Sequence, residues 1–111
     1  MRIEIIRTDG TKSEVHINKR GAIATIYKLI GCENGDAVNL HDGRVMIVDD
    51  DGWECQTVDH GNGHVELKPI RPRDGKSINY HATALYWGIC RPGTKHQIVG
   101  DVAIATDEDF A

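Results

Sequence analysis

The sequence lacks the long apolar runs of a membrane or secreted protein. No run approaches the roughly 18 residues that a transmembrane helix needs. Segment 1–7 interleaves apolar and charged side chains, unlike the continuous apolar stretch of a signal peptide. We therefore expect a protein that stays in the cytosol in which it is made.

Cysteine and aromatic residues are also scarce. Cys32, Cys55 and Cys90 are odd in number and widely spaced, which favours reduced thiols over a disulfide framework. Aromatic residues make up only 5% of the chain, so the core must consist mainly of Ile, Val, Ala and Leu. A length of 111 residues with 40% hydrophobic and 27% charged residues predicts a single globular domain, 1–111.

Recognisable catalytic and nucleotide-binding motifs are missing. No Gly-x-Gly-x-x-Gly or Walker-type loop precedes a predicted helix, and segment 61–63 (Gly-Asn-Gly) is typical of a flexible loop. No Ser-His-Asp or Cys-His signature can be read from the sequence. We therefore predict a non-enzymatic protein without a cofactor.

Charge is unevenly distributed along the chain, although the net charge is only −4. Segments 1–35 and 61–97 carry +2 and +4, whereas 36–60 and 98–111 carry −6 and −4. If folding keeps these segments apart, the protein has distinct acidic and basic faces suited to charged partners. If folding interleaves them, the charges cancel.

Two Asp-Gly turns between alternating apolar runs predict β-hairpins. The first hairpin pairs 2–7 with 12–17, and the second pairs 37–40 with 45–48. The run 45–48 (Val-Met-Ile-Val) is uninterrupted, which predicts a strand buried on both faces and central in its sheet.

Apolar residues at helical spacing predict a long helix over 22–30. Asn18 is the expected N-cap, and Gly31 ends the helix. A second, shorter helix is expected to begin after Asn79 as N-cap and to end near Gly88.

The remaining segments complete the expected architecture. A short strand is predicted at 53–58, followed by a loop insertion at 57–77 that includes a short extended piece at 64–67 and an irregular basic stretch at 68–77. A last strand is predicted at 98–105 with Gly100 at a bulge or close approach. The acidic tail 106–111 is expected to fray. The fold class is α+β: a mixed or antiparallel sheet built of hairpins with one long and one short helix, similar to a β-grasp arrangement.

Three segments follow one another along the chain: Gly43–Gly52, Asn79–Leu85 and Ile98–Val102. They resemble a family of small proteins from bacteriophages, plasmids and conjugative elements. This family shares a valine-rich strand, an acidic turn, Asn-x-x-Ala-Thr and Val-Gly-Asp-Val. The resemblance covers roughly the C-terminal two-thirds, and the chain departs from it by inserting 57–76. It carries no established activity, but it implies a mobile element acting in the bacterial host cytosol.

An acidic turn is the first candidate site. It consists of Asp49, Asp50, Asp51 and Glu54. These carboxylates lack the Asp-x-Asp-x-Asp-Gly alternation of a calcium loop, and consecutive side chains point apart. They are expected either to bind a basic partner or to form a solvated turn between two strands.

A basic segment with aromatic neighbours is the second candidate. Interleaved cations and rings can bind a nucleic acid through phosphate contacts and base stacking. An isoelectric point of about 5.8 argues against strong bulk affinity for DNA. The contact residues would be Lys68, Arg71, Arg73 and Lys76, with Arg91, Lys95, Tyr80, Tyr86 and Trp87 nearby.

A pocket formed by Asn79, His81 and Thr83 is the third candidate. The structural alternative is that Asn79 caps the short helix and that Thr83 bonds to the backbone. Both tryptophans, Trp53 and Trp87, are expected to lie in the core. The alternative is that one of them is exposed and anchors an interface with a partner.

The histidines offer a candidate zinc site. Cys55, His60 and His64 lie close in sequence, but a closed site would need His81, His96 or an acidic residue as a further ligand. The alternative is exposed loop histidines, and we predict no metal.

The leading hypothesis is a small phage or mobile-element protein that binds a host protein through its acidic surface. One form of it is an inhibitor of a bacterial defence system, comparable to an anti-CRISPR protein, that occupies a basic groove on its target. The alternatives are nucleic-acid binding through 68–95 and small-molecule binding near His81.

Overall fold

The computed structural model describes residues 1–106 and 108, in which seven strands and two helices form. All strand pairs are antiparallel, which confirms the α+β class. The elements are β1 (Arg2–Ile6), β2 (Lys12–His16), α1 (Ala22–Ile30), β3 (Gly35–Asn39), β4 (Arg44–Asp49), β5 (Trp53–Asp59), β6 (Val65–Pro72), α2 (Tyr80–Trp87) and β7 (Val102–Thr106).

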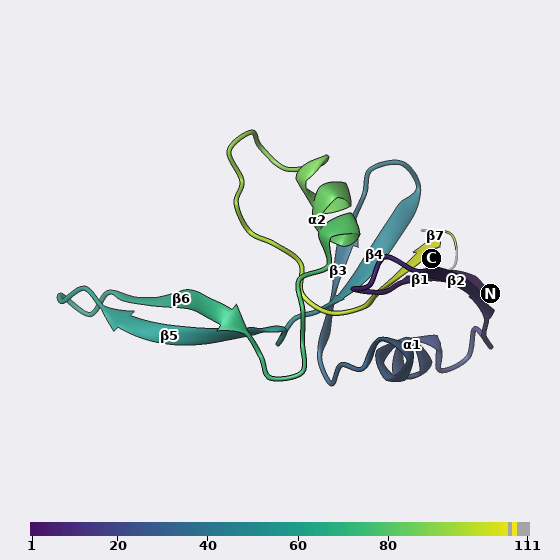
Figure 1. The fold of residues 1–111 in the computed structure, drawn as a ribbon, viewed down its shortest axis with the longest axis horizontal. Coiled ribbons are helices and arrows are strands. Elements are labelled where there is room, and N and C mark those ends of the chain that lie inside the picture. Colours follow the sequence, from purple (N-terminus) through teal and green to yellow (C-terminus); the bar gives the residue numbers. More distant parts are fainter. Residues whose placement is uncertain (107, 109–111) are drawn as a thin grey trace.

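Five of the strands form one sheet with the order β2-β1-β7-β4-β3. The C-terminal strand β7 lies at its centre, between β1 and β4 (Figure 1). Strands β2 and β3 are the edges of this sheet. The two remaining strands, β5 and β6, pair only with each other among the described residues.

The sheet is covered on both faces, with α1 below it and α2 above it in Figure 1. On the α1 face, Ile26 and Ile30 pack against β-strand residues that include Ile3, Ile5 and Ile47. Because both faces of the sheet are covered, the side chains of its central strands are buried on either side and need not alternate between apolar and polar. This explains the continuous apolar sequences of β4 and β7.

On the opposite face, Ala82 of α2 packs with the strand residues Ile6, Met46 and Val102. The partly buried Leu85 and Tyr86 extend this cluster outward. The two clusters together form the hydrophobic core of the body, by which we mean the five-stranded sheet with α1 and α2. No residue of β5 or β6 belongs to either cluster as described.

Both predicted hairpins are confirmed. Strand β1 pairs with β2 from Arg2–His16 to Ile6–Lys12, and β3 pairs with β4 around the Asp42-Gly43 turn. In the second turn the Asp42 carboxylate accepts hydrogen bonds from the Arg44 backbone and side chain. This fixes the turn geometry and lowers the pKa of Asp42, mainly through the hydrogen bond from the Arg44 side chain.

The long helix is confirmed, but its predicted N-cap is wrong. Gly21 occupies the cap position with φ = 70°, and Gly31 ends the helix in the same left-handed conformation. Asn18 instead accepts a hydrogen bond from the Arg20 backbone N–H in the preceding turn. A glycine suits this cap because a side chain disfavours positive φ.

The short helix begins as expected. The Asn79 side chain accepts a hydrogen bond of 3.0 Å from the backbone N–H of Ala82. The last strand begins later than predicted, at Val102, because Gly100 turns the chain with φ = 86°. The preceding segment contributes only the isolated bridge between Ile78 and Val99.

The prediction of a loop insertion over 57–77 is wrong for most of that segment, although the strand expected at 53–58 is confirmed and the extended piece expected at 64–67 overlaps β6. Strands β5 and β6 form a long antiparallel hairpin, which we call the arm, and β6 includes both Pro69 and Pro72. Proline is tolerated because each strand of a two-stranded ribbon has one free edge, where a missing N–H breaks no ladder bond. Within this segment, only the turn at 60–64 and the stretch after Pro72 lie outside the strands.

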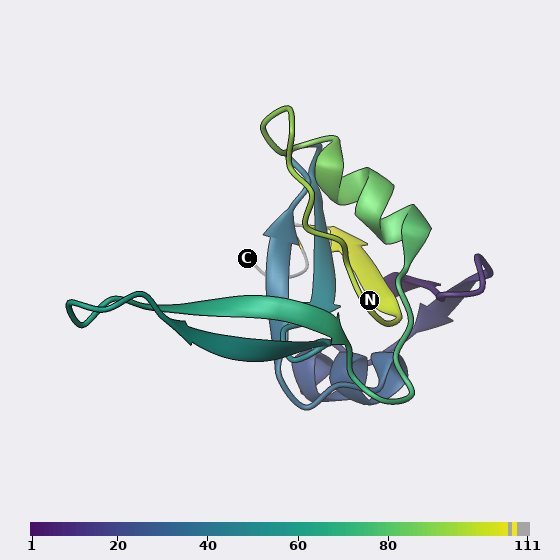
Figure 2. The ribbon, with the colours of Figure 1, turned by 60° about the vertical axis from the view of Figure 1, so that its left-hand side comes forward.

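The arm projects from the body, as Figures 1 and 2 show. The radius of gyration is 15.1 Å, whereas a compact domain of this length is expected near roughly 13 Å. The accessible surface is 7254 Å² for 12.3 kDa, against roughly 6,100 Å² for a typical compact monomer of that mass. The arm therefore leaves an unusually large surface uncovered.

Two further sequence expectations concern the ends and the membrane. Within the described residues, no helix is long and apolar enough to cross a bilayer. The prediction that the tail frays over 106–111 is wrong for Thr106, which closes β7, while residues 107 and 109–111 lie outside the described part of the chain.

Candidate functional site

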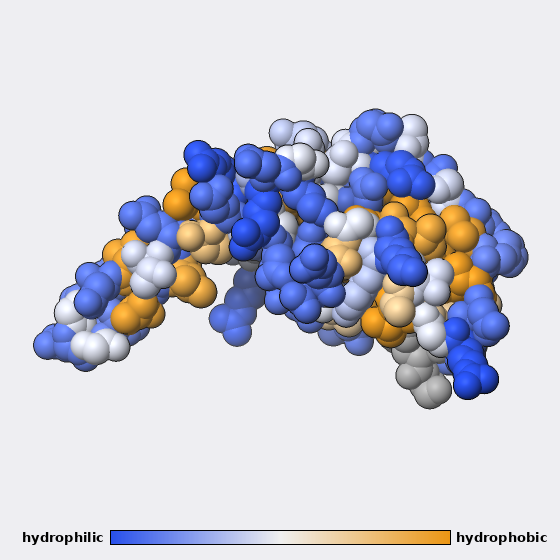
Figure 3. All heavy atoms as spheres, turned by 90° about the horizontal axis from the view of Figure 1, so that it is seen from below, coloured by the Kyte–Doolittle hydropathy of each residue, from blue (hydrophilic) through white to orange (hydrophobic). Residues whose placement is uncertain are grey.

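The arm carries large apolar side chains that face solvent. Val65, Leu67 and Ile70 of β6 are 56%, 69% and 52% exposed. Hydrophobic residues lie along the arm in Figure 3, away from the body. A two-stranded hairpin is at best marginally stable alone in water, so an apolar ribbon of this kind suits a surface that another molecule covers.

The register places Val65 and Leu67 on one side of the arm. Cys55 pairs with Pro69, Thr57 with Leu67, and Asp59 with Val65, so these residues share a face. We call this face the inner face because Cys55, Leu67 and Pro69 line a cavity against the body. A β-bulge near Glu54 leaves Ile70 as an extra residue on β6.

The cavity lies where the arm leaves the body, and we call it the root groove. Its volume is about 320 Å³, and its walls come from the arm, the edge strand β3, the end of β4 with the turn that follows it, Tyr86 of α2 and the segment 96–99. The apolar and aromatic walls include Val38, Trp53, Leu67, Pro69, Tyr86 and His96. Asp36, Asp49 and Asp50 also line it.

Three aromatic rings meet in the root groove. The ring centres of Trp53 and His96 are 6.2 Å apart, and those of Tyr86 and His96 are 6.0 Å apart in an edge-to-face arrangement. The pKa of Tyr86 is raised by a hydrogen bond with Cys90, by burial, and by electrostatic interactions with Cys90 and Asp36. The Asp36 carboxylate therefore lies near enough to Tyr86 to influence its ionisation, and both residues line the root groove.

The root of the arm is firmly attached to the body. Trp53 donates a hydrogen bond of 2.9 Å from its indole Nε1 to the carbonyl oxygen of Gln97. Arg73 donates two hydrogen bonds across the base of the arm. Its backbone N–H donates to the carbonyl oxygen of Gly52, and its Nε donates to the carbonyl oxygen of Asp51. The groove walls are thus held in place while the tip of the arm extends outward.

The acidic turn does not form one free acidic face. The Asp49 side chain is only 4% exposed and pairs with Lys76 at 3.1 Å. Asp51 accepts a hydrogen bond from Asn34, and Glu54 pairs with Arg71 at 2.9 Å. Asp50 is exposed and lines the root groove.

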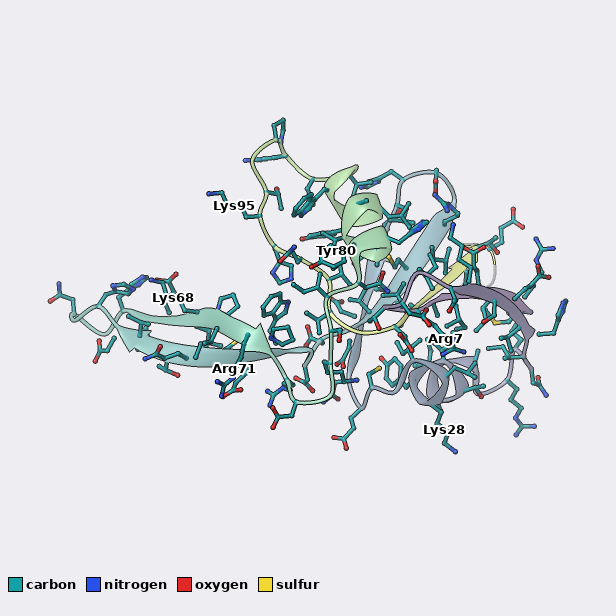
Figure 4. All side chains as sticks on the ribbon, viewed as in Figure 1. Arg7, Lys28, Lys68, Arg71, Tyr80 and Lys95 are labelled. Atoms are coloured by element: carbon teal, nitrogen blue, oxygen red, sulfur yellow. The ribbon has the colours of Figure 1, made fainter. Side chains whose placement is uncertain are left out.

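The predicted basic contacts are mostly engaged within the molecule. Arg71, Arg73 and Lys76 bind Glu54, the Asp51 carbonyl and Asp49, respectively. Lys68 forms no ion pair with any residue that the structure describes. Lys68 and Arg71 lie on the arm, Lys95 on the loop after α2, and Tyr80 on α2 itself, so these residues do not converge on one face (Figure 4).

Asn79 and Thr83 have structural roles, in line with the alternative that the sequence left open. Asn79 is buried, and its Nδ2 donates hydrogen bonds to the carbonyl oxygens of Ile6 and Gly100. Thr83 donates to the Asn79 carbonyl and accepts from the Ile98 N–H. His81 is half-buried on α2, and none of these three residues lines the root groove.

The candidate zinc ligands are separated along the arm. Cys55 lies at its root, paired with Pro69, whereas His60 and His64 lie at its tip with ring centres 5.5 Å apart. His60 contacts the Glu66 carboxylate at 2.7 Å. Across residues 1–106 and 108, no three His, Cys, Asp or Glu side chains are arranged to hold a metal ion.

Sequence reasoning missed the root groove because its walls are far apart in the chain. Trp53, Tyr86 and His96 become neighbours only after folding. One signal was present, since Val65, Leu67 and Pro69 alternate with polar residues as in a strand with one apolar face.

In comparisons with known proteins, no family model, curated protein or solved structure matches the chain.

Proposed function

We propose that this chain is a non-enzymatic binding protein that engages another protein through its arm and root groove. The observation that carries the proposal is the exposure of Val65, Leu67 and Ile70 on a ribbon outside the core. Burying apolar surface contributes roughly 25 cal/mol per Å² to the free energy of binding. A partner protein that covers these side chains would therefore stabilise the complex.

The size of the uncovered surface fits such a partner. The accessible surface of 7254 Å² exceeds that of a typical compact monomer by roughly 1,100 Å². A standard protein–protein interface buries about 800 Å² on each partner. The surface in excess of a compact monomer is therefore as large as one side of a standard interface.

The proposal retains a host protein as the partner and changes the surface that binds it. Asp49 and Glu54 are paired within the molecule, so the acidic turn is a weaker candidate than the arm. Action on a bacterial defence system remains a prediction based on the family resemblance. Nucleic-acid binding is less supported because Arg71, Arg73 and Lys76 are already engaged.

A site-specific photo-crosslinker tests the proposal. Benzoylphenylalanine would replace Leu67 on the arm and, as a matched control, Ile23, which is 43% exposed on α1. In bacterial cells, position 67 should crosslink to a defined protein that position 23 does not reach, with or without nuclease treatment. An absent crosslink at 67, or the same products from both positions, would contradict the proposal.

A further inference from the structure

The root groove has the chemistry of a site for a cationic side chain. None of its described lining residues is Lys or Arg, whereas three are aspartates. Asp49 is neutralised by Lys76. Asp36 and Asp50 form no ion pair with any residue that the structure describes, so their negative charge is available to a ligand.

The aromatic walls favour the same ligand. Trp53, Tyr86 and His96 line one cavity, and the ring centre of His96 lies 6.2 Å from that of Trp53 and 6.0 Å from that of Tyr86. The faces of tryptophan and tyrosine rings attract Lys or Arg cations within about 6 Å. Leu67, Pro69 and Val38 provide apolar contacts for the aliphatic stem of such a side chain.

The dimensions indicate a side chain rather than a whole metabolite. A volume of about 320 Å³ lies at the lower limit of the 300–1,000 Å³ typical of small-molecule sites. The apolar surface also continues beyond the groove, along Leu67 to Val65 on the inner face of the arm. A small ligand would leave that surface uncovered, whereas an extended polypeptide would cover it.

We infer that the root groove binds a Lys or Arg side chain presented by an extended, apolar segment of the partner protein. This inference rests on the proposed function and specifies the chemistry of the partner. The basic side chain enters between the aromatic rings and the carboxylates of Asp36 and Asp50. The neighbouring apolar residues of the segment lie along the inner face of the arm.

Blocked nonapeptides of alternating Leu and Lys are the probe. One matched peptide replaces each Lys by norleucine, which keeps the aliphatic stem and removes the charge, and another replaces it by Glu. Binding is followed in ¹H–¹⁵N spectra at the Trp53 indole N–H. The Lys peptide should bind about tenfold more tightly than the norleucine peptide, and the Glu peptide should not bind.

Protein variants locate the charge effect. Asp36→Asn with Asp50→Asn should weaken Lys-peptide binding at least fivefold. Glu4→Gln with Glu14→Gln makes the same change in net charge on β1 and β2, at the opposite side of the sheet, and should leave binding unchanged. Equal binding of the Lys and norleucine peptides, or equal weakening by both double variants, would overturn the inference.

Two further outcomes separate this inference from the proposed function. If the crosslink at position 67 persists but the Lys peptide has no advantage, the arm binds a protein and the cationic site is wrong. If the free chain is a dimer by sedimentation, and its groove signals shift on dilution without peptide, a second copy occupies the groove and the peptide inference is overturned.

Discussion

The indole Nε1 of Trp53 donates a hydrogen bond to the carbonyl oxygen of Gln97, 44 residues further along the chain. This bond joins the first residue of the arm to the segment that leads into β7, the central strand of the sheet. The same indole ring forms a wall of the root groove. The arm is therefore fixed at its root and projects into solvent beyond it.

Shortening the arm should leave the body folded. Gln56 and Lys68 are partners across the ribbon, so replacing 57–67 with Asn-Gly closes a shorter hairpin without changing its register. No described residue of the arm belongs to a core cluster, so we expect the free energy of unfolding to change by less than about 1 kcal/mol. Urea unfolding measures this, and loss of the cooperative transition would show that the arm is part of the core.

Replacing Asn79 should be strongly destabilising. Asn79→Ala removes the cap of α2 and leaves two buried carbonyl oxygens, those of Ile6 and Gly100, without their donor. Loss of a cap costs about 1 kcal/mol and each buried unpaired group about 1–3 kcal/mol, so we expect a loss of about 3 kcal/mol. Urea unfolding provides the value, and a loss below 1 kcal/mol would refute this role.

Asn79→Asp is the matched variant for that experiment. It keeps the oxygen that accepts from Ala82 but places a carboxylate against the carbonyl oxygens of Ile6 and Gly100. It should be at least as unstable as the alanine variant at neutral pH. Near-native stability would mean that only the cap matters.

The sequence predicted the body of the protein better than the arm. The Asp42-Gly43 turn and the cap at Asn79 were recognised because each depends on neighbouring residues alone. Most of the arm was taken for a loop because turn-forming residues and prolines are frequent in 57–77. Proline is unfavourable only in central strands, whereas each strand of a ribbon has a free edge.

The candidate site was only partly predictable for a related reason. Acidic and basic residues could be named, but whether a charge is free depends on its partner in space. Asp49 and Lys76 are 27 positions apart in the chain and form an ion pair at 3.1 Å, which removes both from the surfaces predicted for them.

Breaking this ion pair should destabilise the protein. Lys76→Met leaves the Asp49 carboxylate, which is 4% exposed, without a cation. Removing one partner of a buried pair costs about 3–5 kcal/mol, and we expect about 2 kcal/mol because Lys76 is partly exposed. Chemical denaturation measures the loss, which should be at least 1 kcal/mol for the account to hold.

The double variant isolates the interaction itself. With Asp49→Asn added to Lys76→Met, no unpaired charge remains, so part of the lost stability should return. Additive losses in the double variant would show that the two side chains act independently.

The cysteines should react at different rates with a thiol reagent. Cys55 is exposed on the arm, whereas Cys32 is half-buried, and burial raises the pKa of the Cys32 thiol. Because the thiolate is the reactive form, Cys32 should react more slowly at neutral pH and accelerate as the pH rises toward its raised pKa. Mass spectrometry of partially labelled protein checks the order, and equal rates for Cys32 and Cys55 would contradict it.

The central claim is that the arm is the binding element, and the affinity of the crosslinked partner tests it most directly. The purified partner would be titrated calorimetrically into the chain with its arm intact and into the variant with 57–67 replaced by Asn-Gly. Our account predicts at least a hundredfold weaker binding to the shortened arm, while the body remains folded. Affinities within threefold of each other would show that the partner binds elsewhere and would contradict the account.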